Sequence, residues 1–189
     1  AKIICNDHVS FQSFNLLIRM IKKISYFCAD DIVVLTEHDR KILAHNCFLK
    51  NKVSNIGNMS PYETVNCSHE KEDLVLAVGR LTEQKNFLEL LSIWKNVNKK
   101  KWKLLIVGSG EQEHLLTEYI KKENIESVSI IPSSKKIDYF YRRAKIIAMT
   151  SKYEGLPMVL IEAKNYGVAS ISYDCETGPR EIISDDGYI

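Results

Sequence analysis

The second part of the chain alternates mostly apolar runs with amphipathic helical patterns, and no other feature constrains its fold as strongly. Five of these runs have the length of a strand: Leu74–Val78, Leu104–Val107, Val128–Ile131, Ile146–Met149 and Ala169–Tyr173. Between the runs, apolar residues recur every three or four positions, as in Phe87, Leu90, Leu91 and Trp94. Strands that are buried on both faces and separated by helices are typical of a doubly wound parallel sheet. The pattern therefore predicts an α/β fold with a Rossmann-like sheet.

Residues 1–70 show a shorter version of the same pattern. Three apolar runs are predicted to be strands: Lys2–Cys5, Asp31–Thr36 and Val53–Asn58. The segment from Phe14 to Phe27 has apolar residues at helical spacing and is predicted to be an amphipathic helix. Thr36 is a residue type that caps helices, and Asp39 three positions later fits a capping pattern. This part of the chain is therefore also expected to be α/β.

The boundary between the two parts is expected near residue 70. Residues 59–72 contain Pro61 and mixed charges, and they are predicted to form a linker. We therefore expect one domain with its linker at 1–70 and a second domain at 71–189.

The composition excludes several classes of protein. A chain of 189 residues with 45% apolar content can bury a core, and its net charge of +2 gives no indication of a nucleic-acid partner. No apolar run approaches the ~20 residues of a membrane span, and no signal peptide opens the chain. The cysteines are odd in number, scattered and without a CxxC pair: Cys5, Cys28, Cys47, Cys67 and Cys175. This usage favours a reducing compartment without a zinc site, so we predict a soluble, cytoplasmic protein.

The stretch YEGLPMVLIEA, which begins at Tyr153, follows one of the apolar runs. Gly155 and Pro157 are expected to turn the chain and open a helix, because proline suits a first helical turn. The N-terminus of a helix offers unpaired N–H groups and a positive dipole end to a phosphate. Glu154 and Glu162 lie eight residues apart, so about two helical turns could bring both carboxylates toward one crevice. Such a combination suits a sugar nucleotide.

Two further loops follow predicted strands of the second domain. Gly79 would let a backbone come close, Arg80 offers a planar fork for phosphate oxygens, and Lys85 adds a mobile charge. The sequence GSG that begins at Gly108 follows the next strand, but the third glycine of a dinucleotide fingerprint is missing. Because the carboxyl ends of parallel strands hold the ligands of such sheets, these loops are expected at one site.

The segments EGLPMVLIE and GRLTEQKN, each after a predicted strand, resemble the motifs of the family-four retaining glycosyltransferases, which have the two-domain GT-B fold. The resemblance implies that a nucleotide-sugar donor is bound by Gly79, Arg80, Lys85, Gly108, Gly110, Gly155, Leu156, Pro157 and Glu162. It also implies catalytic roles for Glu154 and for His8, which follows a predicted strand like a histidine that faces the family's reaction centre. No Asp-x-Asp motif occurs and the histidines lack metal-ligand spacing, so no metal is expected.

Other segments match the family less closely. Ser133 stands after a strand where the family contacts the base through its backbone. The segment Thr177–Glu181 resembles a variant of the family's Gly-Gly-x-x-Glu turn and fits equally well the start of a helix with Glu in its first turn. Lysine clusters at 99–101, 121–122 and 135–136 are expected to be solvated, with contact to an anionic membrane surface as the alternative.

The resemblance implies transfer of a sugar from a nucleotide diphosphate, UDP-linked, to a glycan or lipid-linked acceptor with retention, as in bacterial surface-polysaccharide synthesis. No cofactor other than this donor is expected. Arg80, Lys85 and the helix end at Gly155 would stabilise the leaving diphosphate, Glu162 would hold the ribose hydroxyls, and Glu154 would orient the sugar. Two alternatives stay open: a sugar-nucleotide epimerase on the same fold, and a non-catalytic nucleotide-binding module.

Members of this family carry further sequence before the equivalent of Lys2 and after that of Ile189. The chain is therefore expected to be part of a longer enzyme and to be inactive by itself. In that interpretation, residues 1–70 are the end of an N-terminal acceptor domain, and residues 71–189 are most of a C-terminal donor domain.

Overall fold

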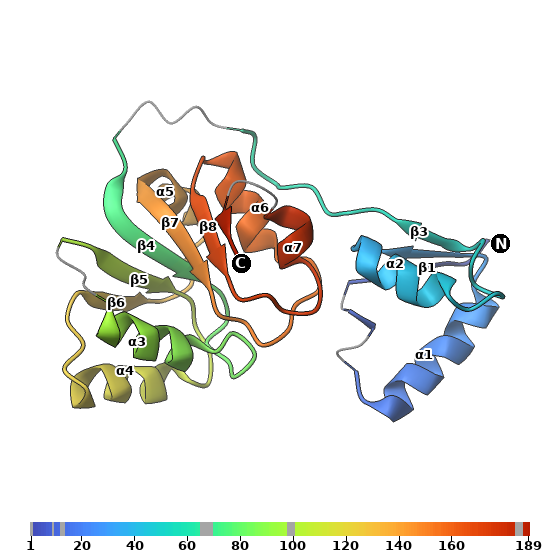
Figure 1. Ribbon diagram of the computed structural model, residues 1–189, viewed down its shortest axis with the longest axis horizontal. Helices are drawn as coiled ribbons and strands as arrows, with labels where there is room; N and C mark the ends of the chain where they lie inside the picture. The colour runs from blue at the N-terminus through green and yellow to red at the C-terminus, as the bar shows by residue number, and fades with distance from the viewer. Residues whose placement is uncertain (1, 9, 12–13, 65–69, 98–100, 184–186) are drawn as a thin grey trace. The chain divides into compact units, whose positions relative to one another are not determined.

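The structure, a computed structural model, describes the chain from Lys2 to Ile189 except residues 9, 12–13, 65–69, 98–100 and 184–186 (Figure 1). The chain forms two compact units. The first unit comprises residues 1–59, 153–157 and 174–182, and the second comprises residues 60–152, 158–173 and 183–189. Short segments from the second half of the sequence therefore belong to the first unit.

The second unit is built on a six-stranded parallel sheet. Its strands are β4 (Glu72–Val78), β5 (Lys103–Val107), β6 (Val128–Ile131), β7 (Ala144–Met149), β8 (Ala169–Ser172) and β9 (Gly187–Tyr188). They lie in the order β6-β5-β4-β7-β8-β9, and neighbouring strands pair in parallel. The five predicted strands and the doubly wound arrangement are confirmed. The short β9 was not predicted, because two residues carry no apolar run.

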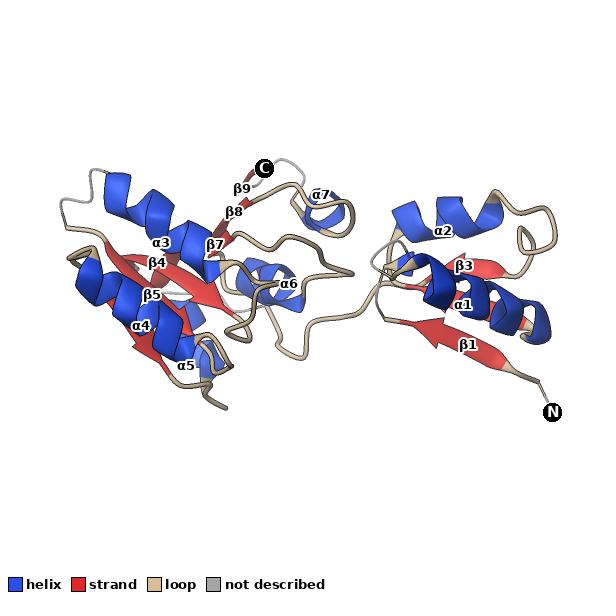
Figure 2. Ribbon diagram, turned by 90° about the horizontal axis from the view of Figure 1, so that it is seen from below, coloured by secondary structure: helices blue, strands red, loops and turns tan. Residues whose placement is uncertain are grey.

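Helices cover both faces of this sheet. They are α3 (Phe87–Asn96), α4 (Glu113–Lys122), α5 (Ile137–Arg143) and α6 (Met158–Asn165). Figures 1 and 2 show α3 and α4 side by side on one face, with α5 and α6 on the other. The core under α3 and α4 includes Ala77, Leu91, Ile106 and Leu116, each without exposed surface. Burial of a leucine or isoleucine side chain contributes about 1.5–3 kcal/mol, so this layer holds the sheet and helices together.

The sheet reverses its direction of growth at β4. This strand pairs with β5 on one side and with β7 on the other. The chain first proceeds outward through β5 and β6, and then returns to β7 and proceeds outward through β8 on the opposite side. Ligands of open parallel sheets bind outside the carboxyl ends of the strands at such a reversal. A ligand of the second unit is therefore expected beyond Val78.

The first unit contains a three-stranded parallel sheet in the order β1-β2-β3. The strands and helices of the first unit are β1 (Ile4–Asp7), α1 (Leu16–Cys28), β2 (Asp31–Val34), α2 (Glu37–Ala44), β3 (Val53–Asn55) and α7 (Pro179–Ile182). β1 lies two residues later than predicted, because its pairing with β2 runs from Ile4 through the polar Asn6 and Asp7. β2 ends at Val34, since Thr36 already serves as the N-cap of α2.

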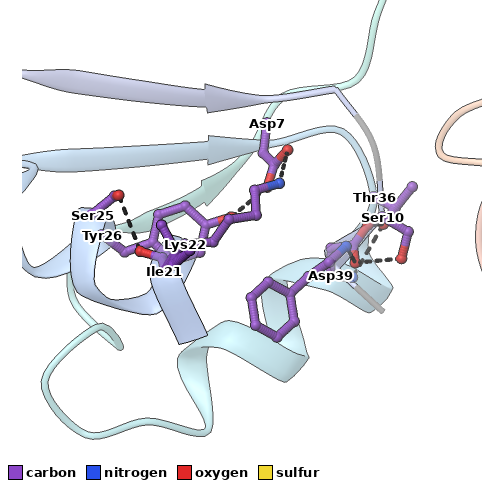
Figure 3. A network of polar contacts seen from close by, with 9 residues as sticks. Asp7, Ser10, Ile21, Lys22, Ser25, Tyr26, Thr36 and Asp39 are labelled. Carbon is purple, nitrogen blue, oxygen red and sulfur yellow. Dashed lines mark hydrogen bonds and ion pairs between the residues drawn. The ribbon is translucent and has the colours of Figure 1, made fainter. Parts of the chain in front are cut away.

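Helix α1 turns a polar side toward β1. The carboxylate of Asp7 forms an ion pair with Lys22 Nζ at 2.6 Å and accepts a hydrogen bond from the Tyr26 hydroxyl (Figure 3). Burial of the Tyr26 ring, together with the Asp7 carboxylate, raises the pKa of its hydroxyl far above the usual tyrosine range. The helix is amphipathic as predicted, but its apolar residues are exposed, with 67% of Leu17 and 65% of Ile24 accessible. The apolar pattern therefore does not build the core here.

Asp39 ties helix α2 to the loop after β1. Its backbone N–H donates to Thr36 Oγ1 at 3.1 Å, which confirms the predicted cap. Its carboxylate, only 4% exposed, accepts from Ser10 Oγ at 3.0 Å, from the Phe11 N–H at 3.1 Å and from Thr36 Oγ1 at 2.8 Å (Figure 3). A buried carboxylate that accepts several hydrogen bonds is stable, and it fixes the chain that leaves β1.

The predicted linker 59–72 lies partly outside the described residues, since 65–69 are not described. Where the chain is described, Tyr62 is packed within the second unit. Its ring contacts Tyr166 with centroids 5.7 Å apart, and its carbonyl accepts a hydrogen bond from the Asn165 side chain. β4 begins at Glu72, so the last predicted linker residue is already in the sheet.

Replacement of Asp39 by alanine is expected to destabilise the first unit. Ser10, Phe11 and Thr36 would each lose a buried acceptor, and hydrogen bonds to charged groups are the stronger kind. We expect a loss of about 2–4 kcal/mol in the free energy of unfolding, measured by circular dichroism in urea.

Asp138→Ala serves as the control for this change, because the partner of Asp138 is an exposed Arg142 at 3.9 Å. It should alter the same free energy by less than about 1 kcal/mol. Trp94 and Trp102 lie in the second unit, so their fluorescence follows that unit separately. A urea midpoint of Asp39→Ala equal to that of the control would contradict the role assigned to Asp39.

Candidate functional site

A pocket of about 300 Å³ opens at the carboxyl ends of β4, β5 and β6. Its wall is formed by Val78–Arg80, Val107–Ser109, Ser133, Ser134, Ile137 and Glu162. Segments that the sequence analysis singled out separately thus meet at one place. The pocket lies at the edge of the sheet where its topology predicts a ligand.

Glycines allow the loops after β4 and β5 to touch. A Cβ on Gly108 would lie 1.9 Å from the carbonyl oxygen of Gly79, and a Cβ on Gly110 would lie 2.4 Å from that of Leu81. Both contacts are with backbone, so a change of rotamer could not relieve them. Gly108 lines the pocket, whereas Gly110 is not part of its wall. The GSG sequence therefore serves the close contact between two loops of the protein.

The two predicted cations lie differently. Arg80 is exposed and lines the pocket, and no described residue forms a hydrogen bond or an ion pair with its guanidinium. The side chain of Lys85 instead covers Gly79, where a Cβ would lie 3.2 Å from Lys85 Cε. The guanidinium of Arg80 thus forms part of the pocket wall, and the side chain of Lys85 packs on Gly79 of the same wall.

Glu162 supplies the carboxylate of the pocket. It lies on α6, is half-buried, and accepts a hydrogen bond at Oε2 from the Tyr141 hydroxyl at 2.7 Å. Tyr141 lies on α5 and has no exposed surface. Tyr141 was not among the predicted site residues. A tyrosine at a buried position usually needs a partner for its hydroxyl, which is the signal that could have found it.

Ser109 and Ser133 connect the loops after β5 and β6. The Ser133 N–H donates to Ser109 Oγ at 3.1 Å, and the two hydroxyl oxygens lie 3.4 Å apart. Both residues line the pocket. Ser133 was expected to act through its backbone, and in the structure its N–H is engaged by Ser109.

The beginning of EGLPMVLIE belongs to the first unit. Gly178 has a φ of +93°, and a Cβ on it would lie 2.3 Å from the Gly155 carbonyl oxygen and 2.4 Å from Pro157 Cδ. The Thr177 hydroxyl donates to the Glu154 carbonyl oxygen, and Glu154 is 8% exposed. Two motifs that the sequence analysis treated separately are therefore packed against each other.

Helix α6 begins directly after this segment. Its first residue is Met158, so the predicted turn at Gly155 and Pro157 does open a helix, with Pro157 immediately before it. Thr177 and Gly178 pack against Glu154, Gly155 and Pro157. Leu156 is half-buried, and a Cβ on Gly57 in the same unit would lie 3.8 Å from Leu156 Cδ2.

Glu181 caps a helix that is far away in sequence. It lies in the short helix α7, as one of its two predicted interpretations has it. Its carboxylate accepts hydrogen bonds from the backbone N–H groups of Glu37 at 2.8 Å and His38 at 3.0 Å. A negative charge at the N-terminus of α2 is favoured by the helix dipole. The side chain is therefore engaged in holding the first unit together.

His8 directly follows β1 and is exposed, so its position after a strand agrees with expectation. Its catalytic role stays a prediction. Within the ranges that the structure describes, no group of three or more His, Cys, Asp or Glu side chains could hold a metal ion. The helices of the same ranges are all too short or too polar to cross a membrane.

A second pocket of about 330 Å³ lies in the second unit beside α3. Trp94, Trp102 and Ile171 are among the side chains that line it, and no charged residue does. Such a lining does not suit a diphosphate. The chemistry of the candidate site therefore lies in the pocket that contains Arg80 and Glu162.

Comparison with known proteins gives the family. A profile of the family described as glycosyl transferases group 1 matches residues 62–188. The amylovoran biosynthesis glycosyltransferase AmsD of Erwinia amylovora is 52% identical over 197 residues, which cover 100% of this chain and 56% of AmsD. An alpha-1,4-N-acetyl-D-galactosaminyltransferase of Campylobacter jejuni, named for a glycan linked to undecaprenol, is 28% identical, over 89% of this chain and 47% of that protein. The crystal structure of S. aureus TarM with UDP has a TM-score of 0.83 at 22% identity, over 100% of this chain and 40% of TarM.

The chain belongs to the glycosyl transferases group 1 family. Its fold is that of the GT-B glycosyltransferases, as predicted. The chain spans about half the length of the curated relatives that it matches.

Replacement of Gly108 by alanine is expected to disturb the pocket wall, because the new Cβ would collide with the Gly79 carbonyl. Overpacking of this kind typically costs about 1–3 kcal/mol, and a backbone partner places this site at the upper end. Thermal unfolding followed by tryptophan fluorescence measures the effect, since both tryptophans lie in the second unit.

Gly79→Ala is the matched control, because the three atoms nearest to its Cβ would belong to the flexible side chain of Lys85. The control should cost about 1 kcal/mol or less, since that side chain can shift. Equal losses of thermal stability in Gly108→Ala and Gly79→Ala would contradict the role assigned to the loop contact.

Proposed function

We propose that the complete protein transfers a sugar from a UDP-linked donor to a glycan or lipid-linked acceptor with retention of configuration. One observation carries this proposal: Arg80 and Glu162 line the same pocket at the reversal point of the sheet. A guanidinium suits a diphosphate, and a carboxylate suits the hydroxyls of a ribose. The presence of UDP in the TarM structure supports the choice of donor.

The diphosphate is proposed to bind at the loop after β4. Arg80 has no described ion-pair partner and can form two parallel hydrogen bonds to phosphate oxygens. Lys85, packed on Gly79, adds a second positive charge near the same loop. Positive charge that is in place before the reaction lowers the cost of the negative charge that develops on the leaving diphosphate.

The nucleoside is proposed to bind toward β5, β6 and α6. Glu162 would accept hydrogen bonds from the ribose hydroxyls, with Oε2 already held by Tyr141. Ser109 and Ser133 present short hydroxyl side chains at the same wall, which suits an uncharged base.

The transfer step exchanges one bond for another at the anomeric carbon. The bond to the diphosphate oxygen breaks, and the diphosphate leaves with the electron pair. A new bond forms to the oxygen of an acceptor hydroxyl on the same face of the sugar, and the hydroxyl proton passes to the departing diphosphate. Glu154 is proposed to orient the sugar and His8 to act at the reacting centre, roles that rest on the family resemblance.

The acceptor class follows the names of the relatives. AmsD is named for amylovoran biosynthesis, and the C. jejuni relative is named for a glycan on undecaprenol diphosphate. A lipid-linked glycan would be reached by a cytoplasmic enzyme that contacts the membrane surface, and this location is part of the proposal.

Titration calorimetry with UDP, GDP and ADP tests the donor site directly. The chain should bind UDP most tightly, and Arg80→Ala and Glu162→Ala should each weaken that binding about tenfold or more, because each removes a charge-assisted contact. Lys121→Ala, on the exposed end of α4, is the control and should bind UDP like the unmodified chain.

Selective binding of a different nucleotide would contradict the UDP assignment. Equal binding by Arg80→Ala, Glu162→Ala and Lys121→Ala would contradict the location of the site. Product analysis with the complete protein then separates transfer from the alternatives, since an epimerase returns an altered donor and a binding module returns the donor unchanged.

A further inference from the structure

The carboxylate of Glu162 is held by a residue that does not line the pocket. The Tyr141 hydroxyl donates to Glu162 Oε2 at 2.7 Å, from a side chain without exposed surface. Tyr141, which donates this hydrogen bond, lies in the last turn of α5, and Glu162, which accepts it, lies within α6. The direction in which Glu162 faces the pocket therefore depends on two helices that pack on the same side of the sheet.

The ring of Tyr141 has little freedom to move. It is stacked on Tyr166, with centroids 5.6 Å apart and an interplanar angle of 19°. Tyr166 is in turn contacted by the ring of Tyr62 at 5.7 Å and by the guanidinium of Arg142 at 5.3 Å. This arrangement restricts the positions that the Tyr141 hydroxyl can take.

The surroundings of the Tyr141 hydroxyl favour its protonated form, which can donate a hydrogen bond. Burial of Tyr141, followed by the negative charge of Glu162, raises the pKa of its hydroxyl above the ordinary range. Tyr62 is affected in the same direction, since burial and then the charge of Glu162 raise its pKa as well. The hydrogen bond from Tyr141 occupies one lone-pair site of Glu162 Oε2 from within the protein.

We propose that Tyr141 is a positioning residue that makes Glu162 selective for the two adjacent hydroxyls of a ribose. A carboxylate that is anchored at one oxygen presents its remaining lone pairs in fixed directions, which suits two neighbouring donors. A deoxyribose supplies one donor fewer and leaves an oriented acceptor unpaired, which is costly in a partly buried site. This inference rests on the proposed function, because it assumes that a nucleotide occupies the pocket.

The experiment compares UDP with 2′-deoxy-UDP by titration calorimetry on the chain and on Tyr141→Phe. The unmodified chain should bind UDP about tenfold more tightly than the deoxy compound. In Tyr141→Phe the ratio should fall to about threefold or less, through weaker binding of UDP and little change for 2′-deoxy-UDP. If Tyr141 had only a structural role, Tyr141→Phe would weaken the binding of both ligands by the same factor.

Tyr139→Phe is the matched control. Tyr139 lies on the same helix, is 53% exposed and accepts a hydrogen bond from Arg143. The ratio of the affinities of Tyr139→Phe for UDP and 2′-deoxy-UDP should equal that of the unmodified chain. An unchanged ratio in Tyr141→Phe, or an equal loss for both ligands, would overturn the inference and leave the donor site intact. No binding of either ligand by the unmodified chain would overturn the donor site and this inference with it.

A second measurement does not depend on the folding of Tyr141→Phe. Tyr141 can be replaced by 3-fluorotyrosine, which keeps the ring and the hydroxyl, and the fluorine resonance can be followed during titration. Saturation with UDP should shift the resonance more than saturation with 2′-deoxy-UDP. Equal shifts with the two ligands, or no shift with UDP, would overturn the role of Tyr141.

Discussion

The contact between the backbones of the loops after β4 and β5 is the constraint on which the pocket depends. The hydrogen bonding of the sheet continues beyond the strands, because the Gly79 N–H donates to Val107 at 3.1 Å and the Gly108 N–H donates to Ile131 at 2.9 Å. The carboxyl ends of β4, β5 and β6 are therefore connected beside the pocket. A side chain at position 108 would separate them, so the absence of a Cβ there sets how closely the loops approach.

Much of this arrangement could be predicted from the sequence. Strands buried on both faces leave continuous apolar runs, so β4 to β8 were found with boundaries within two residues. In a parallel sheet all carboxyl ends lie at one edge, and this rule alone brings Arg80 and Gly108 to one site. Glu162 was assigned to the same site from the family resemblance. The pocket contains all three residues, and their chemical roles stay predictions.

What the sequence could not show are contacts between segments that no local period connects. The Glu181 carboxylate binds the N-terminus of α2 from a position 144 residues after Glu37. The packing of Gly178 on Gly155 joins two loops of the first unit. Such contacts depend on the tertiary arrangement, whereas apolar periodicity predicts only the type of an element and its apolar face.

Helix α5 shows how the same residue type acquires different roles. Tyr139 and Tyr141 are two positions apart, and successive residues of a helix are rotated by about 100°, so the two rings point to nearly opposite sides. Tyr139 is exposed and binds Arg143, whereas Tyr141 is buried and binds Glu162. The sequence of α6 alone therefore does not determine how its carboxylate faces the pocket. That property belongs to the packing of α5 against α6, and a substitution in the interior of α5 can change it without touching the pocket wall.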